Sequence, residues 1–270
     1  MTVISSTSSS SAAGPLGSPL PGRPAAVVLD SVSKRYGSGS AGVVALDRVS
    51  LTVERGEFVC LVGASGCGKS TLLSLVAGLD APTAGQISVG GRTALMFQEA
   101  ALLPWRTAVA NVELPLKLRG VPKRQRRGQA LALLDVVRLA DFADKRPHEL
   151  SGGMRQRVAL ARSLAQDADV LLMDEPFGAL DAITRDVLHD EIERVAAEQR
   201  LTVLFVTHNV REAARLGDRI VLLSSRPGRV VAEFGVPIER PRRIESAEIA
   251  EISAEVMVSL KAEVRRHADD

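Results

Sequence analysis

The residues best suited to chemistry form one glycine-rich stretch that ends in a lysine and two hydroxyl groups. It reads Gly63-Ala64-Ser65-Gly66-Cys67-Gly68-Lys69-Ser70-Thr71. The largely apolar residues 57–62 precede it and the apolar-periodic residues 72–77 follow it, so a strand, a tight turn and a helix are predicted. The spacing G-x-x-x-x-G-K-[ST] is typical of a loop whose backbone N–H groups wrap phosphates at a helix N-terminus. A plain structural turn is the alternative, and the flanking strand and helix favour a nucleotide site.

Three side chains of this loop carry specific expectations. Lys69 reaches the β- and γ-phosphates as a point charge, and the Ser70 hydroxyl is placed to coordinate Mg²⁺. Cys67 lies inside the loop, so we expect it to react with alkylating reagents and ATP to protect it. The other cysteine, Cys60, is predicted to be a small core residue.

Two carboxylates follow an apolar strand farther along the chain. Residues 170–173 are apolar and lead into Asp174-Glu175-Pro176. A carboxylate at the C-terminal edge of such a strand lies beside the phosphate-binding loop, where Asp174 can hold Mg²⁺ through its water shell. Successive strand residues point in opposite directions, so Glu175 can instead face the attacking water as base or orienter. Acids after an apolar strand are common, but downstream of a phosphate-binding loop they indicate a hydrolytic site.

A second glycine-rich helix start lies at Leu150-Ser151-Gly152-Gly153-Met154. Ser151 is a good N-cap, the two glycines expose backbone N–H groups, and the helix dipole adds about half a positive charge at that end. The segment is therefore predicted to bind an anion, with a plain capped helix as the alternative.

The order of these motifs resembles that of the ATP-binding cassette (ABC) ATPases, whose signature motif matches residues 150–154 and the Arg-Gln-Arg-Val that follows. Gln98 resembles the Q-loop glutamine, and Ala179-Leu180-Asp181 resembles the D-loop. His208 resembles the switch histidine that touches the γ-phosphate, and Tyr36 stands where the family stacks an aromatic ring on adenine. The resemblance spans roughly residues 25–240.

The resemblance implies a fold, a site and a mode of action. The fold is α/β: a P-loop NTPase, ABC ATPase core with an antiparallel β subdomain and a helical signature subdomain. Two copies associate head to tail, and each ATP lies between the phosphate-binding loop of one and the signature motif of the other. Implied nucleotide contacts are Tyr36, Gly63, Ser65, Gly66, Cys67, Gly68, Lys69, Ser70, Thr71, Ser151, Gly152, Gly153 and Asp181. Implied Mg²⁺ ligands are Ser70, Gln98 and Asp174, and implied catalytic residues are Glu175, His208 and Gln98.

The segment from Phe97 to Trp105 narrows the resemblance further. Its Leu-Leu-Pro-Trp, together with Asp-Glu-Pro-Phe-Gly-Ala-Leu-Asp at 174–181, resembles the ATPase subunits of nitrate, taurine and aliphatic sulfonate importers. Trp105 either fills the core or lines the groove that receives a membrane subunit. Residues 225–229 look like the same group, although their local chemistry predicts only a turn between strands.

The leading hypothesis is an ATP-hydrolysing subunit, peripheral on the cytoplasmic face of the cell membrane, that drives import of a small sulfonate or nitrate. It requires a second copy, transmembrane permease subunits and, indirectly, a periplasmic or lipid-anchored solute-binding protein. An ATPase of an exporter or lipid-handling system is the first alternative, which Leu-Leu-Pro-Trp argues against. A soluble ABC protein acting on ribosomes or DNA is the second; such proteins usually carry two cassettes, or zinc modules.

The chain is predicted to divide into three parts. A disordered leader, rich in Ser, Gly, Pro and Ala, covers residues 1–24, and the ATPase domain covers 25–240, with a helical insertion at about 99–168. Residues 241–270 hold a C-terminal helix, with Ile249, Ile252, Val256, Leu260 and Val264 on its packed face. Strands are predicted at 25–29, 43–46, 49–53, 57–62, 87–89, 94–97, 170–173, 201–206 and 219–223, and helices in the insertion at 109–118, 123–137 and 152–164.

Composition excludes several classes of protein. The 270 residues hold 34 basic and 32 acidic side chains, a formal net charge of +2, so no strong field favours nucleic acid and no nucleic-acid partner is expected. No apolar stretch approaches the roughly 18 to 20 residues that cross a bilayer. The basic cluster of Lys117, Arg119, Lys123, Arg124, Arg126 and Arg127 is predicted to be a solvated helix face, with an anionic membrane surface or nucleic acid as the alternative.

Overall fold

A computed structural model describes residues 24–37, 42–178 and 180–268 of the chain. Nearly all of the predicted leader therefore lies outside the described residues, as does Ala179 of the predicted D-loop.

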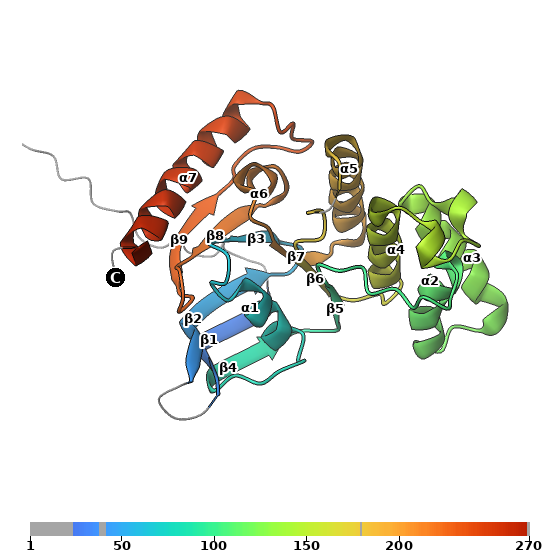
Figure 1. Cartoon of the computed structure of the whole chain (residues 1–270), viewed down its shortest axis with the longest axis horizontal. Helices are drawn as coiled ribbons and strands as arrows, with labels where there is room; N and C mark the ends of the chain where they lie inside the picture. The colour runs from blue at the N-terminus through green and yellow to red at the C-terminus, as the bar shows by residue number, and fades with distance from the viewer. Residues whose placement is uncertain (1–23, 38–41, 179, 269–270) are drawn as a thin grey trace, which may run out of the picture.

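Six strands form the central sheet, in the order β5-β6-β7-β3-β8-β9 (Figure 1). Their bounds are β5 Thr93–Met96, β6 Val170–Asp174, β7 Thr202–Val206, β3 Phe58–Val62, β8 Arg219–Leu223 and β9 Val230–Gly235. The first five are parallel. Strand β9, to which the sequence analysis assigns no bounds, pairs antiparallel with β8. The C-terminal ends of parallel strands meet at one edge of a sheet, which is where an open α/β fold places its ligand site.

A second sheet of three antiparallel strands has the order β2-β1-β4. Its strands are β1 Ala25–Tyr36, β2 Val43–Glu54 and β4 Ala84–Val89. The prediction of separate strands at 43–46 and 49–53 is wrong, because β2 runs through both. Arg48, between them, adopts a φ of 48° and takes up the irregularity without ending the strand.

Helix α1 (Lys69–Val76) lies between the two sheets (Figure 1). Its apolar residues share one buried cluster with the inner face of the antiparallel sheet and one face of the central sheet. Strand β7 shows why both faces of the central sheet are buried: Leu204 and Val206 join this cluster, whereas Val203 and Phe205 join the cluster on the other face.

Three helices form a subdomain at one end of the molecule, on the right in Figure 1. They are α2 Ala108–Leu118, α3 Lys123–Val136 and α4 Gly152–Leu164, with 3₁₀ turns at Ala140–Phe142 and Pro147–Glu149. Their bounds agree with the predicted helices to within a residue. The expected α/β fold, with an antiparallel sheet and a helical subdomain, is confirmed. Part of the basic cluster is used locally, since Arg119 and Arg127 pair with Asp167 and Asp144.

The other face of the central sheet is covered by α5 (Ala182–Gln199) and α6 (Val210–Leu216), and α7 (Ala247–Ala268) packs on α6. Ile249 and Val256 are fully buried in that contact, as the helical spacing predicts. Val264 is 46% exposed, so the packed face of α7 is shorter than predicted.

Candidate functional site

The glycine-rich loop joins β3 to α1 at the C-terminal edge of the central sheet. Gly68 is the N-cap of α1 and has a φ of 102°, a conformation that side-chain-bearing residues rarely adopt. A Cβ atom there would lie 2.7 Å from Leu46 Cδ2 and 2.8 Å from the Ala45 carbonyl oxygen, both on β2. Strand β2 therefore packs directly against the loop. Because Gly68 has no side chain, the backbone of the loop can pass close to β2 and can also approach a phosphate.

Lys69 folds back over this loop. Its ammonium donates hydrogen bonds to the carbonyl oxygens of Gly63 at 2.9 Å and Ala64 at 3.0 Å, and the residue is only 6% exposed. Ser65 and Gly66, at the tip of the loop, are exposed, as is Ser70 on the first turn of α1. The loop thus presents backbone N–H groups, one buried cation and one hydroxyl at a helix N-terminus, which is the donor set that phosphate requires.

Cys67 does not present its thiol to the outside. The residue is 1% exposed, and its Sγ lies 3.7 Å from Lys69 Nζ. Burial raises the pKa of the Cys67 thiol above its usual value, which lowers its reactivity further. The expectation of a thiol open to alkylation is wrong, and only the backbone of Cys67 is available to a phosphate.

The turn at 224–229 lies against the phosphate-binding loop. The Arg226 guanidinium donates to the Gly66 carbonyl oxygen at 3.3 Å, and Gly228 packs so closely that a Cβ atom on it would lie 2.2 Å from the Cys67 carbonyl oxygen. The interpretation of this segment as only a turn between strands was incomplete. Because these contacts bridge more than 150 positions along the chain, no local pattern reveals them.

Ser70, on the first turn of α1, meets Asp174 at the C-terminal end of β6. Burial raises the pKa of the Asp174 carboxyl, and a hydrogen bond from the Ser70 hydroxyl opposes that shift. Among the described residues no group of three or more His, Cys, Asp or Glu side chains is suited to a metal. One hydroxyl and one carboxylate beside a phosphate site nevertheless fit Mg²⁺, which takes few protein ligands and keeps waters and phosphate oxygens.

Glu175 and His208 also come together. Strand β6 pairs in parallel with β7, so residues just beyond Asp174 and Val206 leave the sheet side by side. His208 Nδ1 lies 3.1 Å from Glu175 Oε2, and the imidazole is about two-thirds exposed. Glu175 has a φ of 43°, an unfavourable conformation for a side-chain-bearing residue of the kind that clusters at functional sites.

Gln98 leaves the sheet at the same edge, because β5 pairs with β6 and Met96 lies opposite Met173. The residue is exposed, and no contact described here joins its side chain to Ser70 or Asp174. Its backbone carbonyl oxygen accepts a hydrogen bond from Gln156 on α4. The signature helix thus holds the predicted Q-loop directly.

The predicted signature residues form a capped helix start. Ser151 is the N-cap of α4, and its hydroxyl accepts from the Met154 N–H at 3.2 Å. A Cβ atom on Gly153 would lie 2.9 Å from Leu180, the neighbour of Asp181, so this helix and the predicted D-loop are in contact. Asp181 caps α5 by accepting from the Thr184 N–H at 2.9 Å, and this bond is the main cause of its lowered pKa.

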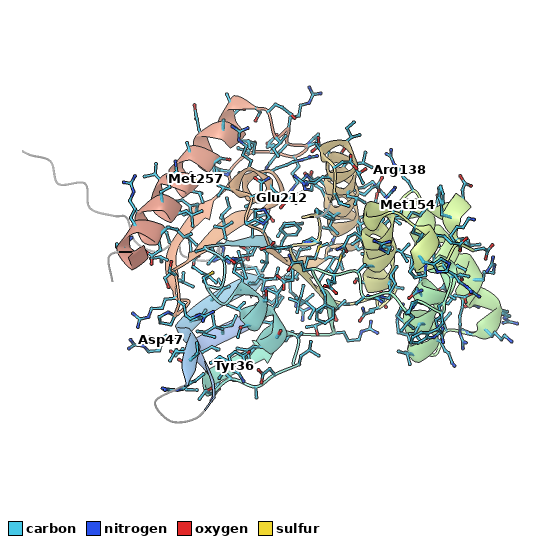
Figure 2. The ribbon with its side chains drawn as sticks, viewed as in Figure 1. Tyr36, Asp47, Arg138, Met154, Glu212 and Met257 are labelled. Atoms are coloured by element: carbon cyan, nitrogen blue, oxygen red, sulfur yellow. The ribbon has the colours of Figure 1, made fainter. Side chains whose placement is uncertain are left out.

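Ser151, Gly152 and Gly153 are not brought to the phosphate-binding loop of the same chain. Figure 1 shows α4 apart from α1, and Figure 2 places Met154 of α4 well away from Tyr36 on the antiparallel sheet. Both halves of the predicted nucleotide clamp are therefore present once, but separated.

Tyr36 ends β1 and is 44% exposed. Lys34 Nζ lies 5.0 Å from the centre of its ring, in a cation–π contact, and pairs with Asp80 at 2.6 Å. The hydrogen bond from Lys34 is the main cause of the lowered pKa of Asp80. An ordered, half-exposed ring suits stacking on a base, and its two supporting residues carry no sequence signal of their own.

A cleft of about 1150 Å³ lies at the opposite edge of the central sheet, at the N-terminal ends of its parallel strands. Its lining includes Asp167, which is paired with Arg92 and Arg119. None of the predicted catalytic residues lines it, so the chemistry is concentrated at the other edge of the sheet.

The fold and the site together define a nucleoside triphosphatase of the phosphate-binding-loop class. Residues 46–178 match the family described as ABC transporter. The chain is 49% identical over 247 residues to the aliphatic sulfonates import ATP-binding protein of Burkholderia ambifaria. The matched region covers 89% of this chain and 73% of that protein. It is 48% identical over 202 residues to the nitrate import ATP-binding protein of Synechocystis sp., covering 72% of this chain and 76% of that one.

Solved structures agree. A dimeric ATP-binding cassette in a post-hydrolysis state with ADP and Pi bound is 35% identical, with a TM-score of 0.73, and covers 79% of this chain and 100% of that one. The chain therefore belongs to the ABC transporter family, and it is an ATPase. No helix within the described residues is long and apolar enough to cross a membrane.

Proposed function

We propose that this ATPase energises an importer of small sulfonates, alkanesulfonate or taurine, or of nitrate. The observation that carries the proposal is the near-50% identity, over most of the chain, to subunits named for aliphatic sulfonate and nitrate import. Identity at that level supports a shared role more strongly than the fold does, because one fold serves many functions.

The working unit in this proposal is a head-to-tail dimer. Separation of the phosphate-binding loop from α4 within one chain supports it, as does the dimeric state of the similar solved cassette. Lys69, Ser65, Gly66, Gly68 and Thr71 hold the phosphates of ATP, with Tyr36 on its adenine. Ser151, Gly152 and Gly153 of the second copy contact the γ-phosphate, and Asp181 lies at the same junction.

Hydrolysis in this proposal uses the pair at the ends of β6 and β7. Glu175 takes a proton from a water molecule as its oxygen attacks the γ-phosphorus, the bond to the β-phosphate oxygen breaks, and ADP and phosphate result. His208, 3.1 Å from the Glu175 carboxylate, orients it toward that water. Mg²⁺, held by Ser70 and Asp174 with Gln98 nearby, would neutralise charge on the phosphates. Lys69 exchanges the Gly63 and Ala64 carbonyl oxygens for phosphate oxygens.

Transmission to transmembrane permease subunits is assigned to the helical subdomain. Trp105 is 69% exposed on the loop after Gln98, which supports a docking role over core filling. A subunit of this kind is peripheral on the cytoplasmic face of the membrane, and a separate solute-binding protein delivers the substrate.

The test is growth of a strain lacking the gene on taurine, a longer alkanesulfonate or sulfate as sole sulfur source, with nitrate tested separately as nitrogen source. We expect growth to fail on one of the imported anions, and to be restored by the intact gene but not by Lys69→Ala. Growth on all sources, in a strain with no second such transporter, would refute the importer assignment.

A further inference from the structure

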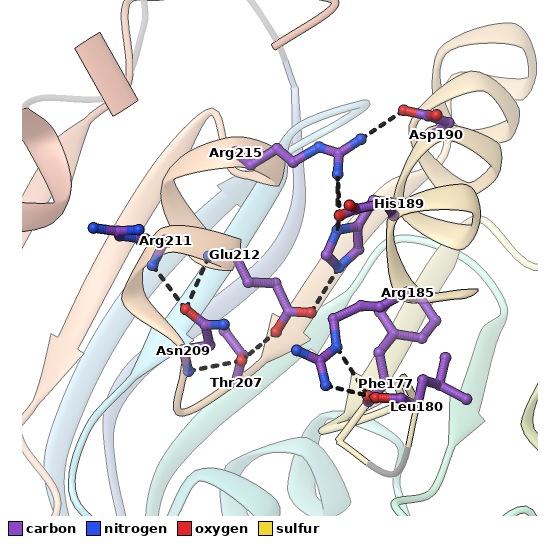
Figure 3. A network of polar contacts seen from close by, with 11 residues as sticks. Phe177, Leu180, Arg185, His189, Asp190, Thr207, Asn209, Arg211, Glu212 and Arg215 are labelled. Carbon is purple, nitrogen blue, oxygen red and sulfur yellow. Dashed lines mark hydrogen bonds and ion pairs between the residues drawn. The ribbon is translucent and has the colours of Figure 1, made fainter. Parts of the chain in front are cut away.

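A buried polar network joins α5 to α6 (Figure 3). Two of its members, Thr207 and Glu212, line the same small cavity as Glu175 and His208. His189 of α5 is fully buried, and its partners Glu212 and Arg215 are each 5% exposed. Thr207, which bonds to Glu212, is 2% exposed. Buried polar side chains in one connected set are costly where their bonds are not made, so such a set favours one geometry. In this set Arg215 Nε is buried without a partner, whereas both terminal nitrogens of Arg215 are bonded. None of these four side chains has a role in the hydrolysis described above.

The donors and acceptors of this network define where its protons lie. Arg215 Nη1 is 3.1 Å from His189 Nδ1, and a guanidinium can only donate, so Nδ1 is an acceptor. The neutral imidazole therefore carries its proton on Nε2 and donates to Glu212 Oε1 at 2.7 Å. The other oxygen of Glu212 accepts from the Thr207 hydroxyl.

The network ends on both neighbours of His208. Thr207 Oγ1 accepts from the Asn209 N–H at 3.0 Å, and Asn209 in turn caps α6 by accepting from the N–H groups of Arg211 and Glu212. The backbone on each side of His208 is thereby fixed, whereas its own ring is held at Glu175 alone among the contacts described. A cavity of about 40 Å³, enough for one or two waters, has Glu175, His208 and Glu212 in its wall.

Helix α5 also reaches the predicted D-loop. It begins after its N-cap, Asp181, and Arg185 on its first turn donates to the carbonyl oxygens of Phe177 at 3.3 Å and Leu180 at 2.8 Å. One rigid helix therefore contacts the segment before Asp181 at one end and, one turn beyond Arg185, the same buried polar network.

We propose that His189 is a positioning residue for ATP hydrolysis. Through Glu212 and Thr207 it orients His208 toward Glu175. The orientation of His208 then depends on the position of α5, and hence on that of the D-loop, which α5 contacts. This inference rests on the proposed function, because it takes Glu175 and His208 as the hydrolytic pair.

The test compares three substitutions on α5. His189→Leu removes both hydrogen bonds, whereas His189→Gln keeps an acceptor for Arg215 and a donor for Glu212. Ile192→Ala is the control, because Ile192 is fully buried one turn away and lies outside the network. We expect His189→Leu to lower kcat about 10-fold or more with the KM for ATP within about 3-fold, as for a group that acts only in the transition state. His189→Gln and Ile192→Ala should retain kcat within about 3-fold.

Coupling to His208 separates positioning from mere destabilisation. If His189 acts through His208, adding His189→Leu to His208→Ala lowers kcat no further, since the group being aimed is gone. A full multiplicative loss in the double variant would overturn the proposal, as would a normal kcat for His189→Leu. Should His189→Leu not fold, the near-isosteric Thr207→Val tests the same link, with the same expected loss and the same absence of a further effect in His208→Ala.

Two further readouts isolate this inference from the assignment of the site. The ¹⁵N chemical shifts of the His189 ring must report the neutral tautomer with its proton on Nε2, and a proton on Nδ1 would contradict the network itself. Normal turnover by Glu175→Gln or His208→Ala would refute the hydrolytic pair instead, and would leave the ring tautomer unchanged.

Discussion

At the residue scale, Asp174 works against the stability of the fold. Burial raises the pKa of its carboxyl, so the folded chain holds this proton more tightly than the unfolded chain does. The stability that the protonated carboxyl contributes is fully present below the unfolded pKa of about 3.9, and it is lost as the pH rises through the folded pKa and the carboxyl ionises. At neutral pH the charged form of Asp174, which we propose holds Mg²⁺, therefore lowers the stability of the fold.

We expect Asp174→Asn, without nucleotide or Mg²⁺, to melt at a higher temperature than the parent at pH 7, by about 2–4 °C for each kcal/mol recovered. The difference should shrink as the pH is lowered toward 4.5. The same change should lower kcat about 100-fold or more, because a metal contact contributes several kcal/mol. Thermal unfolding from pH 4.5 to 8 checks the first claim and steady-state hydrolysis the second.

Asp169→Asn is the control, because Asp169 precedes the other end of β6 and its carboxylate accepts a hydrogen bond from the Arg92 N–H at 2.8 Å. It should not raise the melting temperature. A lower melting temperature for Asp174→Asn at pH 7 would contradict the argument from burial.

Cys67 gives a second prediction at this scale. Because its thiol is buried and its pKa is raised, we expect iodoacetamide at pH 8 to label it at least about 100-fold more slowly than in the denatured chain. Because the pKa of Cys67 lies above the usual pKa of a thiol, the labelling rate should continue to rise with pH beyond that usual value. ATP should change the labelling rate little. Peptide mass spectrometry distinguishes Cys67 from Cys60; rapid labelling that ATP blocks would show an open thiol.

At the scale of elements, one buried side chain shapes the loop that carries Trp105. Asn111, on the first turn of α2, is fully buried. Its amide accepts from the Leu103 N–H at 2.8 Å and donates to the carbonyl oxygens of Leu103, Arg106 and Thr107. These bonds fold residues 103–107 into a fixed turn with Trp105 on its outside.

Asn111→Ala should therefore lower the free energy of unfolding by about 1–3 kcal/mol, since it leaves the part-buried Leu103 N–H without its side-chain partner. Trp105→Ala should change that free energy by no more than about 0.5 kcal/mol, because the ring is 69% exposed. If the loop docks on a permease, Trp105→Ala should instead reduce the ATPase stimulation by the reconstituted permease. Urea unfolding tests a role of Trp105 in the core, and permease-stimulated ATPase activity tests a role in docking. A clearly lower free energy of unfolding for Trp105→Ala would indicate that Trp105 is a core residue.

The elements that carry the site were predictable because their signals are local. Glycine spacing, an apolar strand ending in Asp174 and a capped helix at Ser151 each occupy fewer than ten residues, and the strand-end geometry of a parallel sheet then brings Asp174 and Glu175 to the phosphate-binding loop. The turn at 225–229 implies a strand after it, but the sequence analysis gives the edge strand β9 no bounds, because a turn signal fixes neither the length nor the pairing of the strand that follows. Several contacts of the site join distant positions of the chain. Leu46 packs closely against Gly68, Gly228 packs closely against Cys67, and His189 is hydrogen-bonded to Glu212. Only the folded chain reveals such contacts.

At the scale of the whole molecule, the separation of α4 from α1 predicts that neither copy hydrolyses ATP alone. We expect Lys69→Ala and Ser151→Arg chains each to be inactive. Mixed in equal amounts they should recover about a quarter of the parental activity, since half of the dimers are mixed and one of their two sites is intact. Steady-state hydrolysis against the mixing ratio measures this. A mixture as inactive as its components would argue against a shared site.

The most direct test of the central claim is the molar mass and turnover of Glu175→Gln in Mg-ATP, measured on the same sample by light scattering and phosphate release. With the base removed and the phosphate contacts intact, we expect turnover to fall at least about 100-fold and ATP to hold the protein at twice the mass of one chain. The parent should return to single chains as ATP is consumed. Near-normal turnover by Glu175→Gln, or a mass of one chain with ATP bound, would contradict a dimeric site in which Glu175 activates the water.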